Sequence, residues 1–148
     1  MTAVFLGMIL IAFASYTAVR YWQEQDSRYR RMDPVPGCDL AAGPCRRVLD
    51  DGEVSLSITP GPIPLMQPLT LQVGLVGIEV TAVVVEIRGL NMDMGLNRVR
   101  LQQQAPGVWS GETILPICSR RRMEWEAAVR LGDGPGVEIP FPFSTTRP

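Results

Sequence analysis

The chain of 148 residues contains no histidine, and all 14 of its basic residues are arginine, so lysine is absent as well. These absences remove most general-base chemistry, because a serine or cysteine nucleophile normally needs a histidine or lysine beside it. A catalytic zinc site normally needs at least one imidazole ligand. The 15 acidic residues are scattered, and no pair stands in a context that raises the pKa of one carboxyl. The sequence therefore predicts a protein that is not an enzyme.

A strong net charge is also lacking, since the formal charge is only −1. Nothing in this balance indicates a polyanion, so nucleic acid is not predicted as a partner. Once the apolar N-terminus is set aside, roughly 110 residues remain, which is enough for one domain with one core.

The N-terminus carries an uncharged run, Thr2 to Val19, which is followed by Tyr21 and Trp22. At 1.5 Å per residue the run spans about 27 Å, close to the roughly 30 Å of a hydrocarbon core, and the aromatic pair suits the interface. We therefore predict a transmembrane anchor over residues 1–22 that contacts the lipid bilayer through residues 2–22. The alternative is a signal peptide cleaved near "AFA", Ala12 to Ala14. Against cleavage, no Lys or Arg precedes the run, and the run continues past this point.

The flanking charges and the cysteines give opposite indications of topology. Four arginines follow the apolar run, and the positive-inside rule alone would keep the domain in the cytoplasm. Long domains, however, translocate largely regardless of flanking charge, and the cysteine usage is typical of an oxidising compartment. We predict a single-pass membrane protein whose domain faces an oxidising compartment outside the cytoplasm.

Three cysteines are present. Cys38 and Cys45 flank a short Gly/Pro loop, and the spacing favours a disulfide that ties down a segment with little apolar content. The alternative is a pair of thiolate metal ligands, although the spacing matches no specific zinc motif. Cys118 is predicted to be a buried small hydrophobe, and the alternatives are a disulfide with Cys38 or Cys45 or a role as a ligand.

The remainder of the chain is organised in runs of alternating apolar residues. Residues 23–36 are polar, begin as a continuation of the helix and end in prolines, so they predict a juxtamembrane stalk. Beyond the stalk, period-two alternation predicts seven strands and an all-β fold, an immunoglobulin-like antiparallel β-sandwich over residues 37–148. Pro140 and Pro142 predict that the last strand lies at an edge. The seven runs are Val54–Ile58, Leu69–Leu75, Val80–Gly89, Val99–Leu101, Val108–Pro116, Met123–Leu131 and Val137–Phe143.

The segment "RGLNMDMGLN" places Met92 and Met94 two residues apart in a polar, glycine-bounded stretch. In an extended segment the two side chains share one face, and thioether sulfur selects Cu(I) over hard cations. Because histidine is absent, such a site has to be all sulfur. Cys118, Met123 and Met66 are candidates for a third ligand, and the convergence of loops at one end of a sandwich favours Cys118. The alternative is that these methionines only pack the end of the sandwich.

Two further groups have simple interpretations. Arg120, Arg121 and Arg122 are predicted to form a solvated hairpin tip, with docking of an acidic partner or lipid phosphates as the alternative. Trp109 and Trp125 have apolar neighbours at period two and are predicted to lie in the core.

The combination of an N-terminal membrane helix, a sandwich, a Met-x-Met loop after the third strand and "PGVWSGETILP" resembles the FixH-like and YtkA-like group of small bacterial membrane-anchored proteins. The resemblance covers about residues 69–131. It implies a single-pass protein of the bacterial inner membrane whose domain faces the periplasm, and it implies copper handling or the assembly of respiratory haem-copper oxidases. The chain departs from the pattern in having no histidine near the methionines and in carrying three cysteines. The matching positions are Gly89, Met92, Met94, Gly95, Gly107 and Trp109.

These observations predict a periplasmic, membrane-anchored accessory or assembly factor of a respiratory membrane complex, such as a copper-containing oxidase. Met92, Met94 and Cys118 would bind Cu(I) transiently, and no other cofactor is predicted. The alternative is a metal-free interaction module or accessory subunit that binds a membrane protein complex.

Overall fold

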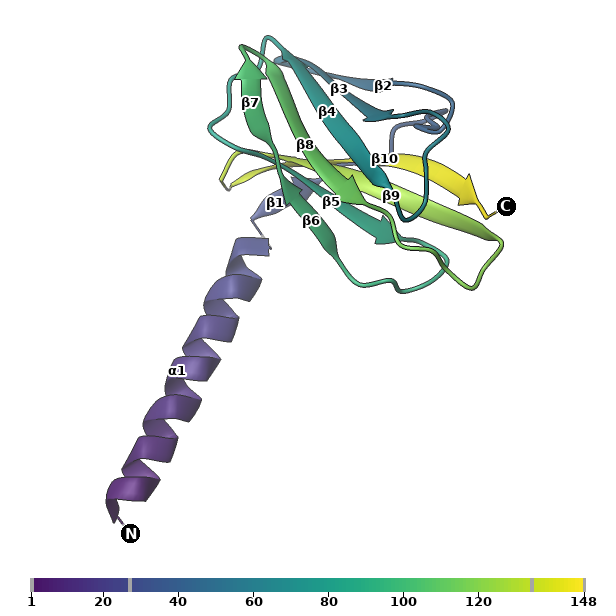
Figure 1. Ribbon diagram of the computed structural model, residues 1–148. Helices are drawn as coiled ribbons and strands as arrows, with labels where there is room; N and C mark the ends of the chain where they lie inside the picture. The colour runs from purple at the N-terminus through teal and green to yellow at the C-terminus, as the bar shows by residue number, and fades with distance from the viewer. Residues whose placement is uncertain (1, 27, 134, 148) are drawn as a thin grey trace.

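The computed structural model describes residues 2–26, 28–133 and 135–147, and it joins one long helix to a domain of two β-sheets (Figure 1). The outermost residues of the predicted anchor and domain, Met1 and Pro148, lie outside the described residues. A mostly β domain with one N-terminal apolar helix agrees with the fold class predicted from the sequence.

Helix α1 spans Thr2–Asp26, four residues further than the predicted anchor. Its stretch Val4–Glu24 is long and apolar enough to cross a membrane, and none of this stretch is buried against the domain. Length and composition of this kind are shared by membrane anchors and signal sequences. The helix projects away from the domain as a separate rod (Figure 1).

Within the described residues the domain contains ten strands in two five-stranded sheets. The first sheet has the order β1 (Tyr29–Arg31), β10 (Gly136–Thr146), β9 (Arg122–Leu131), β5 (Val83–Gly89) and β6 (Asn97–Arg100). The second has the order β2 (Cys45–Leu49), β3 (Gly52–Thr59), β4 (Pro68–Val76), β8 (Val108–Ile114) and β7 (Gln102–Ala105). The two sheets pack face to face (Figure 1).

The seven predicted strands correspond to β3, β4, β5, β6, β8, β9 and β10, and three strands were not predicted. Strands β1, β2 and β7 read "YRR", "CRRVL" and "QQQA" and lack the apolar alternation that marks a buried face. The predicted run through Leu101 is divided, because β6 pairs with β5 in the first sheet and β7 pairs with β8 in the second. Leu101 is buried at the crossing.

The predicted stalk, residues 23–36, has two parts: residues 23–26 continue helix α1, as predicted, whereas residues from Tyr29 onward join the domain, and Ser27 lies outside the described residues. Tyr29–Arg31 form β1, which pairs in parallel with β10. The chain then continues along β10, since the amide of Met32 donates to the carbonyl of Glu138 at 2.8 Å. The first sheet is therefore mixed, and the prediction of a purely antiparallel sandwich is wrong at this pair.

The prediction that β10 is an edge strand is also wrong, because β1 covers its first residues. The carbonyls of Pro140 and Pro142 accept hydrogen bonds from the amides of Val35 at 3.0 Å and Leu40 at 3.3 Å. In a strand, the nitrogen and carbonyl of one residue point to the same side. Both prolines therefore face the segment that covers β10, and that segment needs only carbonyl acceptors from them. Because no amide donor is required at these two positions, proline is tolerated in a strand that is not at an edge.

The core lies between the sheets and is filled by the inward residues of the alternating runs. Trp125 is buried, stacks on Phe143 with ring centroids 6.2 Å apart, and donates from Nε1 to Oγ1 of Thr145 at 2.8 Å. Trp109 is buried as well, so the predicted core positions of both tryptophans are confirmed.

The outward face of the first sheet carries a network of ion pairs that was not predicted. Three buried glutamates, on β5, β9 and β10, share four arginines. A buried carboxylate is stable only when it is paired and hydrogen-bonded, so the network allows charged side chains to lie in this face. Its members are Glu86, Glu126, Glu138, Arg31, Arg88, Arg98 and Arg130.

Glu138 lies at the centre of this network. Arg130 Nε donates to its Oε2 at 2.7 Å, and Arg31 pairs with its Oε1. Burial by itself would raise the pKa of Glu138, but the hydrogen bonds from Arg130 and Arg31 outweigh burial and hold this pKa below its usual value of 4.5.

We expect the free energy of unfolding to fall in acid because of Glu138. A carboxyl with a lowered pKa in the folded state stabilises the fold above its unfolded pKa, and this contribution is lost as the pH falls through the folded pKa. Urea unfolding followed from about pH 7 to about pH 3 should show this loss below the usual carboxyl pKa. Glu138→Gln should be less stable at neutral pH and show a shallower acid dependence; an equally steep dependence would contradict the assignment.

The disulfide between Cys38 and Cys45 is present, with Cα atoms 5.7 Å apart. Cys45 begins β2, and the disulfide fixes the loop that leads into it. Within the loop, the amide of Ala42 donates to the carbonyl of Asp39 at 2.9 Å and the amide of Ala41 donates to Oδ1 of Asp39 at 3.1 Å. A disulfide in an extracytoplasmic protein is ordinary, which agrees with the predicted oxidising compartment.

Replacing Cys38 and Cys45 by serine is expected to lower the free energy of unfolding by about 2.5 kcal/mol, from the closure entropy of a loop of this length. Urea unfolding of the wild type with and without reductant should give the same difference. A reduced wild type that is as stable as the oxidised protein would show that the loop is held by other contacts.

Candidate metal centre

Two loops meet at the end of the sandwich where β5 and β8 finish. The loop of residues 90–96 joins β5 to β6, and the loop of residues 115–121 joins β8 to β9. Asn97, at the start of β6, donates from Nδ2 to Oγ1 of Thr113 at 2.8 Å, which ties the first sheet to the second beside both loops. This cross-sheet bond fixes the spacing between the loops.

The loop of residues 90–96 is anchored to the start of β9. The amide of Leu90 donates to the carbonyl of Glu124 at 2.8 Å, and the amide of Glu124 donates to Oδ1 of Asn91 at 3.1 Å. Nδ2 of Asn91 also donates to the carbonyl of Arg122 at 3.2 Å. These bonds position the residues that follow, including Met92.

Two glycines shape this loop. A Cβ on Gly89 would lie 2.3 Å from the carbonyl oxygen of Met92, so only glycine lets the loop fold back this closely. Gly95 has φ +72°, and its amide donates to Oδ1 of Asp93 at 2.9 Å. The side chain of Asp93 thus closes a turn between the two methionines and the next strand.

The structure brings the three predicted sulfur ligands together. Sγ of Cys118 lies 2.8 Å from Sδ of Met92 and 3.3 Å from Sδ of Met94. The cysteine comes from the loop after β8 and the methionines from the loop after β5. We call Met92, Met94 and Cys118 the sulfur cluster.

The sulfur cluster has a closed side and an open side. Cys118 is 7% exposed and packs with the core, whereas Met92 is 37% exposed. Met94 is partly buried against the core. A metal ion bound to the cluster would therefore contact the buried thiol on its inner side, and a partner molecule could reach it only from the exposed side, next to Met92.

The other two candidates for a third ligand lie elsewhere. Met123 is buried in the core, with its terminal methyl 3.2 Å from the position that a Cβ on Gly89 would take. Met66 is exposed and has a left-handed backbone, φ 58°. Among the described residues, the sulfur contacts of Cys118 go to Met92 and Met94.

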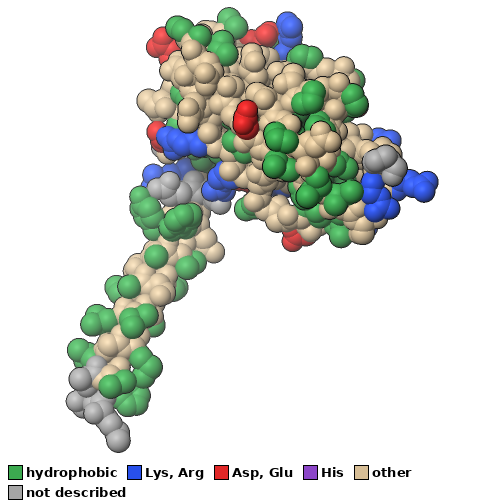
Figure 2. All heavy atoms as spheres, viewed as in Figure 1, with side chains coloured by type: hydrophobic (Ala, Val, Ile, Leu, Met, Phe, Trp, Pro, Cys, Tyr) green, Lys and Arg blue, Asp and Glu red, His purple; other side chains and the backbone are tan. Residues whose placement is uncertain are grey.

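The sulfur cluster is surrounded by exposed apolar side chains that were not predicted as a group. They belong to the two loops and the end of β8, and Figure 2 shows hydrophobic side chains gathered over this end of β8. Contiguous apolar surface of this kind marks interaction sites in soluble domains. A signal was present in the sequence, because these residues break the polar character of their loops. They are Leu90, Leu96, Ile114 and Ile117, and together with Met92 we call them the apolar rim.

Arg120, Arg121 and Arg122 are exposed, as predicted, but they do not form a hairpin tip, because β8 and β9 lie in different sheets and their loop crosses from one sheet to the other. Arg122 begins β9, and its Nε donates to Glu124 Oε1 at 2.8 Å. Arg147, near the C-terminus, donates to the carbonyl of Cys118 at 3.5 Å and adds a further positive charge beside the sulfur cluster.

One thiol and two thioethers form a soft ligand set. Thiolate and thioether sulfur suit Cu(I), and they suit hard, oxygen-seeking cations poorly. Among the described residues, the His, Cys, Asp and Glu side chains form no group of three that could hold a metal, so a metal site here depends on the methionines. Binding through Cys118 would use the thiolate and release a proton.

Comparison of the chain with family models, with curated proteins and with solved structures finds no match.

Proposed function

We propose that this protein is a membrane-anchored, periplasm-facing accessory factor that binds Cu(I) transiently during the assembly of a respiratory membrane complex, such as a haem-copper oxidase. The observation that carries this proposal is the convergence of three sulfurs from two loops on one point. Packing alone does not require a cysteine and two methionines to present their sulfur atoms to one another.

The ligand set and its exposure suit a carrier better than a permanent site. A permanent copper centre is enclosed and rigid, whereas here one ligand, Met92, is open to solvent. A partner can therefore approach the metal from that side and exchange its own ligands for the thioethers. The resemblance of the Met-x-Met segment to the FixH-like and YtkA-like group supports an oxidase as the recipient.

The location in the cell is part of the same proposal. The apolar helix supports a membrane anchor, and the disulfide between Cys38 and Cys45 supports a domain in the periplasm. The orders β3-β4-β8-β7 and β10-β9-β5-β6 support an immunoglobulin-like sandwich, because they correspond to the A-B-E-D sheet and to a G-F-C sheet extended by one strand.

A competition titration tests the copper role. The full-length protein in detergent micelles is mixed, under reducing and oxygen-free conditions, with Cu(I) and a chromophoric Cu(I) chelator. We expect one equivalent to bind to the wild type, and the Met92→Leu, Met94→Leu double variant to lose this binding. Met66→Leu, which removes an exposed methionine outside the sulfur cluster, is the matched control. Equal binding of Cu(I) by the wild type and the double variant would show that the sulfur cluster is not a copper site.

A second candidate function is supported by the apolar rim. Four exposed aliphatic side chains around the sulfur cluster would suit the surface of a membrane protein complex even without metal. In this case the protein is a metal-free interaction module or accessory subunit. Co-purification after gentle solubilisation separates the two functions, because the metal-free module keeps its partner in the presence of a Cu(I) chelator.

A further inference from the structure

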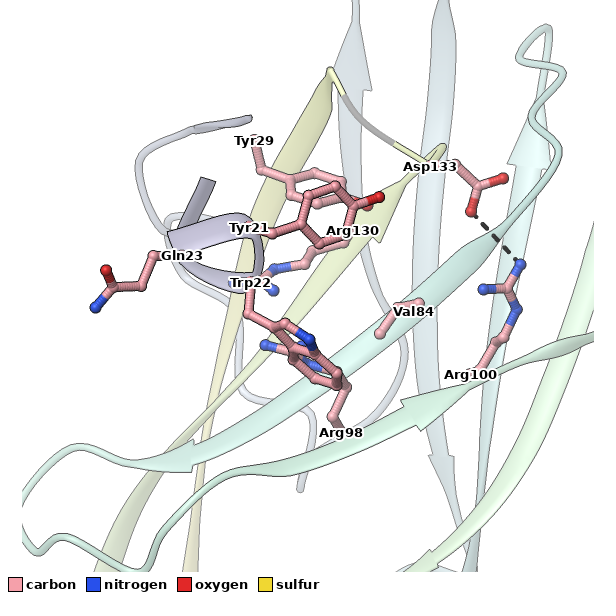
Figure 3. Close-up of a pocket in the computed structure, with 9 residues that line it drawn as sticks. All are labelled: Tyr21, Trp22, Gln23, Tyr29, Val84, Arg98, Arg100, Arg130 and Asp133. Carbon is pink, nitrogen blue, oxygen red and sulfur yellow. Dashed lines mark hydrogen bonds and ion pairs between the residues drawn. The ribbon is translucent and has the colours of Figure 1, made fainter. Parts of the chain in front are cut away.

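A cavity of about 600 Å³ lies between the end of helix α1 and the outward face of the first sheet. Tyr21 and Trp22, from the last turns of the helix, form one wall, and Tyr29 of β1 lies beside them (Figure 3). Arg98 and Arg100 of β6 contribute to the opposite wall (Figure 3). The cavity is distinct from the sulfur cluster, since the residues that line it come from other elements.

The cavity is placed at the depth of lipid headgroups if α1 spans a membrane. The apolar stretch of α1 ends at Glu24, and Trp22 is 73% exposed beside the cavity. Exposed tryptophan and tyrosine at the end of a membrane helix mark the level of the headgroups. A ligand that enters from the bilayer surface would therefore meet this cavity first.

Three arginines give the cavity a positive wall. Arg98 Nη2 pairs with Glu86 at 2.8 Å, and Arg130 Nη1 pairs with the same carboxylate at 3.1 Å. Glu86 is buried, so this carboxylate holds both guanidinium groups in place rather than leaving them to fold away. Among the residues that line the cavity, three are arginines and one, Asp133, carries a carboxylate, so guanidinium groups outnumber carboxylates there.

Arg100 is the arginine that is most available to a ligand. Its Nη2 lies 3.5 Å from Oδ1 of Asp133, and both side chains are largely exposed. An exposed ion pair of this length contributes little stability, so an incoming anion can compete for the guanidinium at small cost. Guanidinium groups bind phosphate oxygens in a two-pronged geometry that lysine does not offer.

We propose that this cavity binds the phosphate of an anionic phospholipid headgroup, with Arg100 as the principal contact and Trp22 against the lipid at the interface. The inference rests on the membrane anchoring in the proposed function and not on copper binding. It gives the domain a fixed orientation above the bilayer, because the headgroup would join the end of α1 to the first sheet.

Delipidated full-length protein in zwitterionic detergent, titrated with phosphatidylglycerol while tryptophan fluorescence is followed, tests the proposal, since Trp22 lines the cavity. We expect saturable binding of phosphatidylglycerol and no comparable response to phosphatidylcholine. Arg100→Gln should weaken the binding about fivefold, the usual contribution of one arginine near an anionic membrane surface. Arg46→Gln is the matched control, because Arg46 is a similarly exposed arginine on the second sheet.

Three results would overturn the proposal. Equal responses to the two lipids would show that the headgroup charge is not recognised. Saturation by inorganic phosphate at the same concentration would show a site for soluble anions instead of lipid. Equal affinities of the Arg100→Gln and Arg46→Gln variants would place the lipid elsewhere.

Vesicle flotation separates this inference from the proposed function. A full-length chain that does not float with vesicles overturns both the anchor and the headgroup site. A chain that floats and binds Cu(I), but shows no preference for phosphatidylglycerol, overturns the headgroup site alone.

Discussion

Replacing Cys118 by serine is expected to lower the affinity for Cu(I) by on the order of 100-fold, with a loss of only about 1 kcal/mol in the free energy of unfolding. The hydroxyl has nearly the shape of the thiol but is a hard ligand, so the metal loses its only anionic soft donor. The carbonyl of residue 118 still accepts the hydrogen bond from Arg147, which keeps the loop in position.

The neighbouring residue provides the matched control for this variant. Oγ of Ser119 lies 3.9 Å from Sδ of Met92, so Ser119→Ala changes a side chain next to the sulfur cluster without removing a sulfur. Ser119→Ala should bind Cu(I) as the wild type does in the competition titration. Wild-type affinity in Cys118→Ser would show that the thiol is a packing residue and that any copper is held by the methionines alone.

The sulfur cluster shows how far a sequence can predict a site of this kind. The spacing of Met92 and Met94 predicted two sulfurs on one face, and the absence of histidine restricted the ligand type. That Cys118 approaches them depends on the pairing of β5 with β9 and of β8 with β4, which bring the two loops to one end of the sandwich. The general convergence of loops in sandwiches made this expectation reasonable, but only the register establishes the contact.

The strands were predicted where one face of the strand is apolar, and they were missed where it is not. Strand β1 exists because the amides of a polar segment pair with β10, and such backbone pairing leaves no trace in side-chain hydropathy. The disulfide could be predicted because the two cysteines are close along the chain, and the structure contains it.

The ion network was missed because its carboxylates are far apart in the sequence. Glu86, Glu126 and Glu138 meet only through the registers that place Arg88 opposite Glu126 and Glu138 opposite Arg130. The signal that existed was the alternation itself, since the outward positions of these apolar strands are occupied by charges of both signs. Charged residues at such positions indicate that the face is covered or that its charges form ion pairs. The cavity between the end of α1 and the first sheet borders this face.

Replacing Trp125 by alanine is expected to have the largest effect on stability, a loss of about 3–5 kcal/mol in the free energy of unfolding. The indole is almost fully buried, and its removal leaves a cavity beside Phe143 and an unpaired hydroxyl on Thr145. Urea unfolding followed by far-ultraviolet circular dichroism measures the loss without relying on the fluorescence of the residue that is removed.

Trp125→Ala should also weaken Cu(I) binding, which links the core to the sulfur cluster. Trp125 stands opposite Gly89 in the β5–β9 register, at the point where the chain turns toward Met92. Loss of the indole opens space opposite Gly89, where the loop of residues 90–96 begins, and we expect this loop to shift away from the sulfur of Cys118. Trp125→Ala is therefore expected to change the distance between Cys118 and the two methionines as well as the stability of the fold.

Trp109→Ala is the control that separates a local effect from general destabilisation. Trp109 is also buried, but it lies near the start of β8, opposite Val73 and away from the end that leads to Cys118. Both variants should lose stability, and only Trp125→Ala should lose affinity for Cu(I) when the two are titrated under conditions in which both remain folded. An equal loss of affinity in the two variants would mean that the cluster responds to overall stability, and that the turn after Gly89 has no special part in holding the sulfurs together.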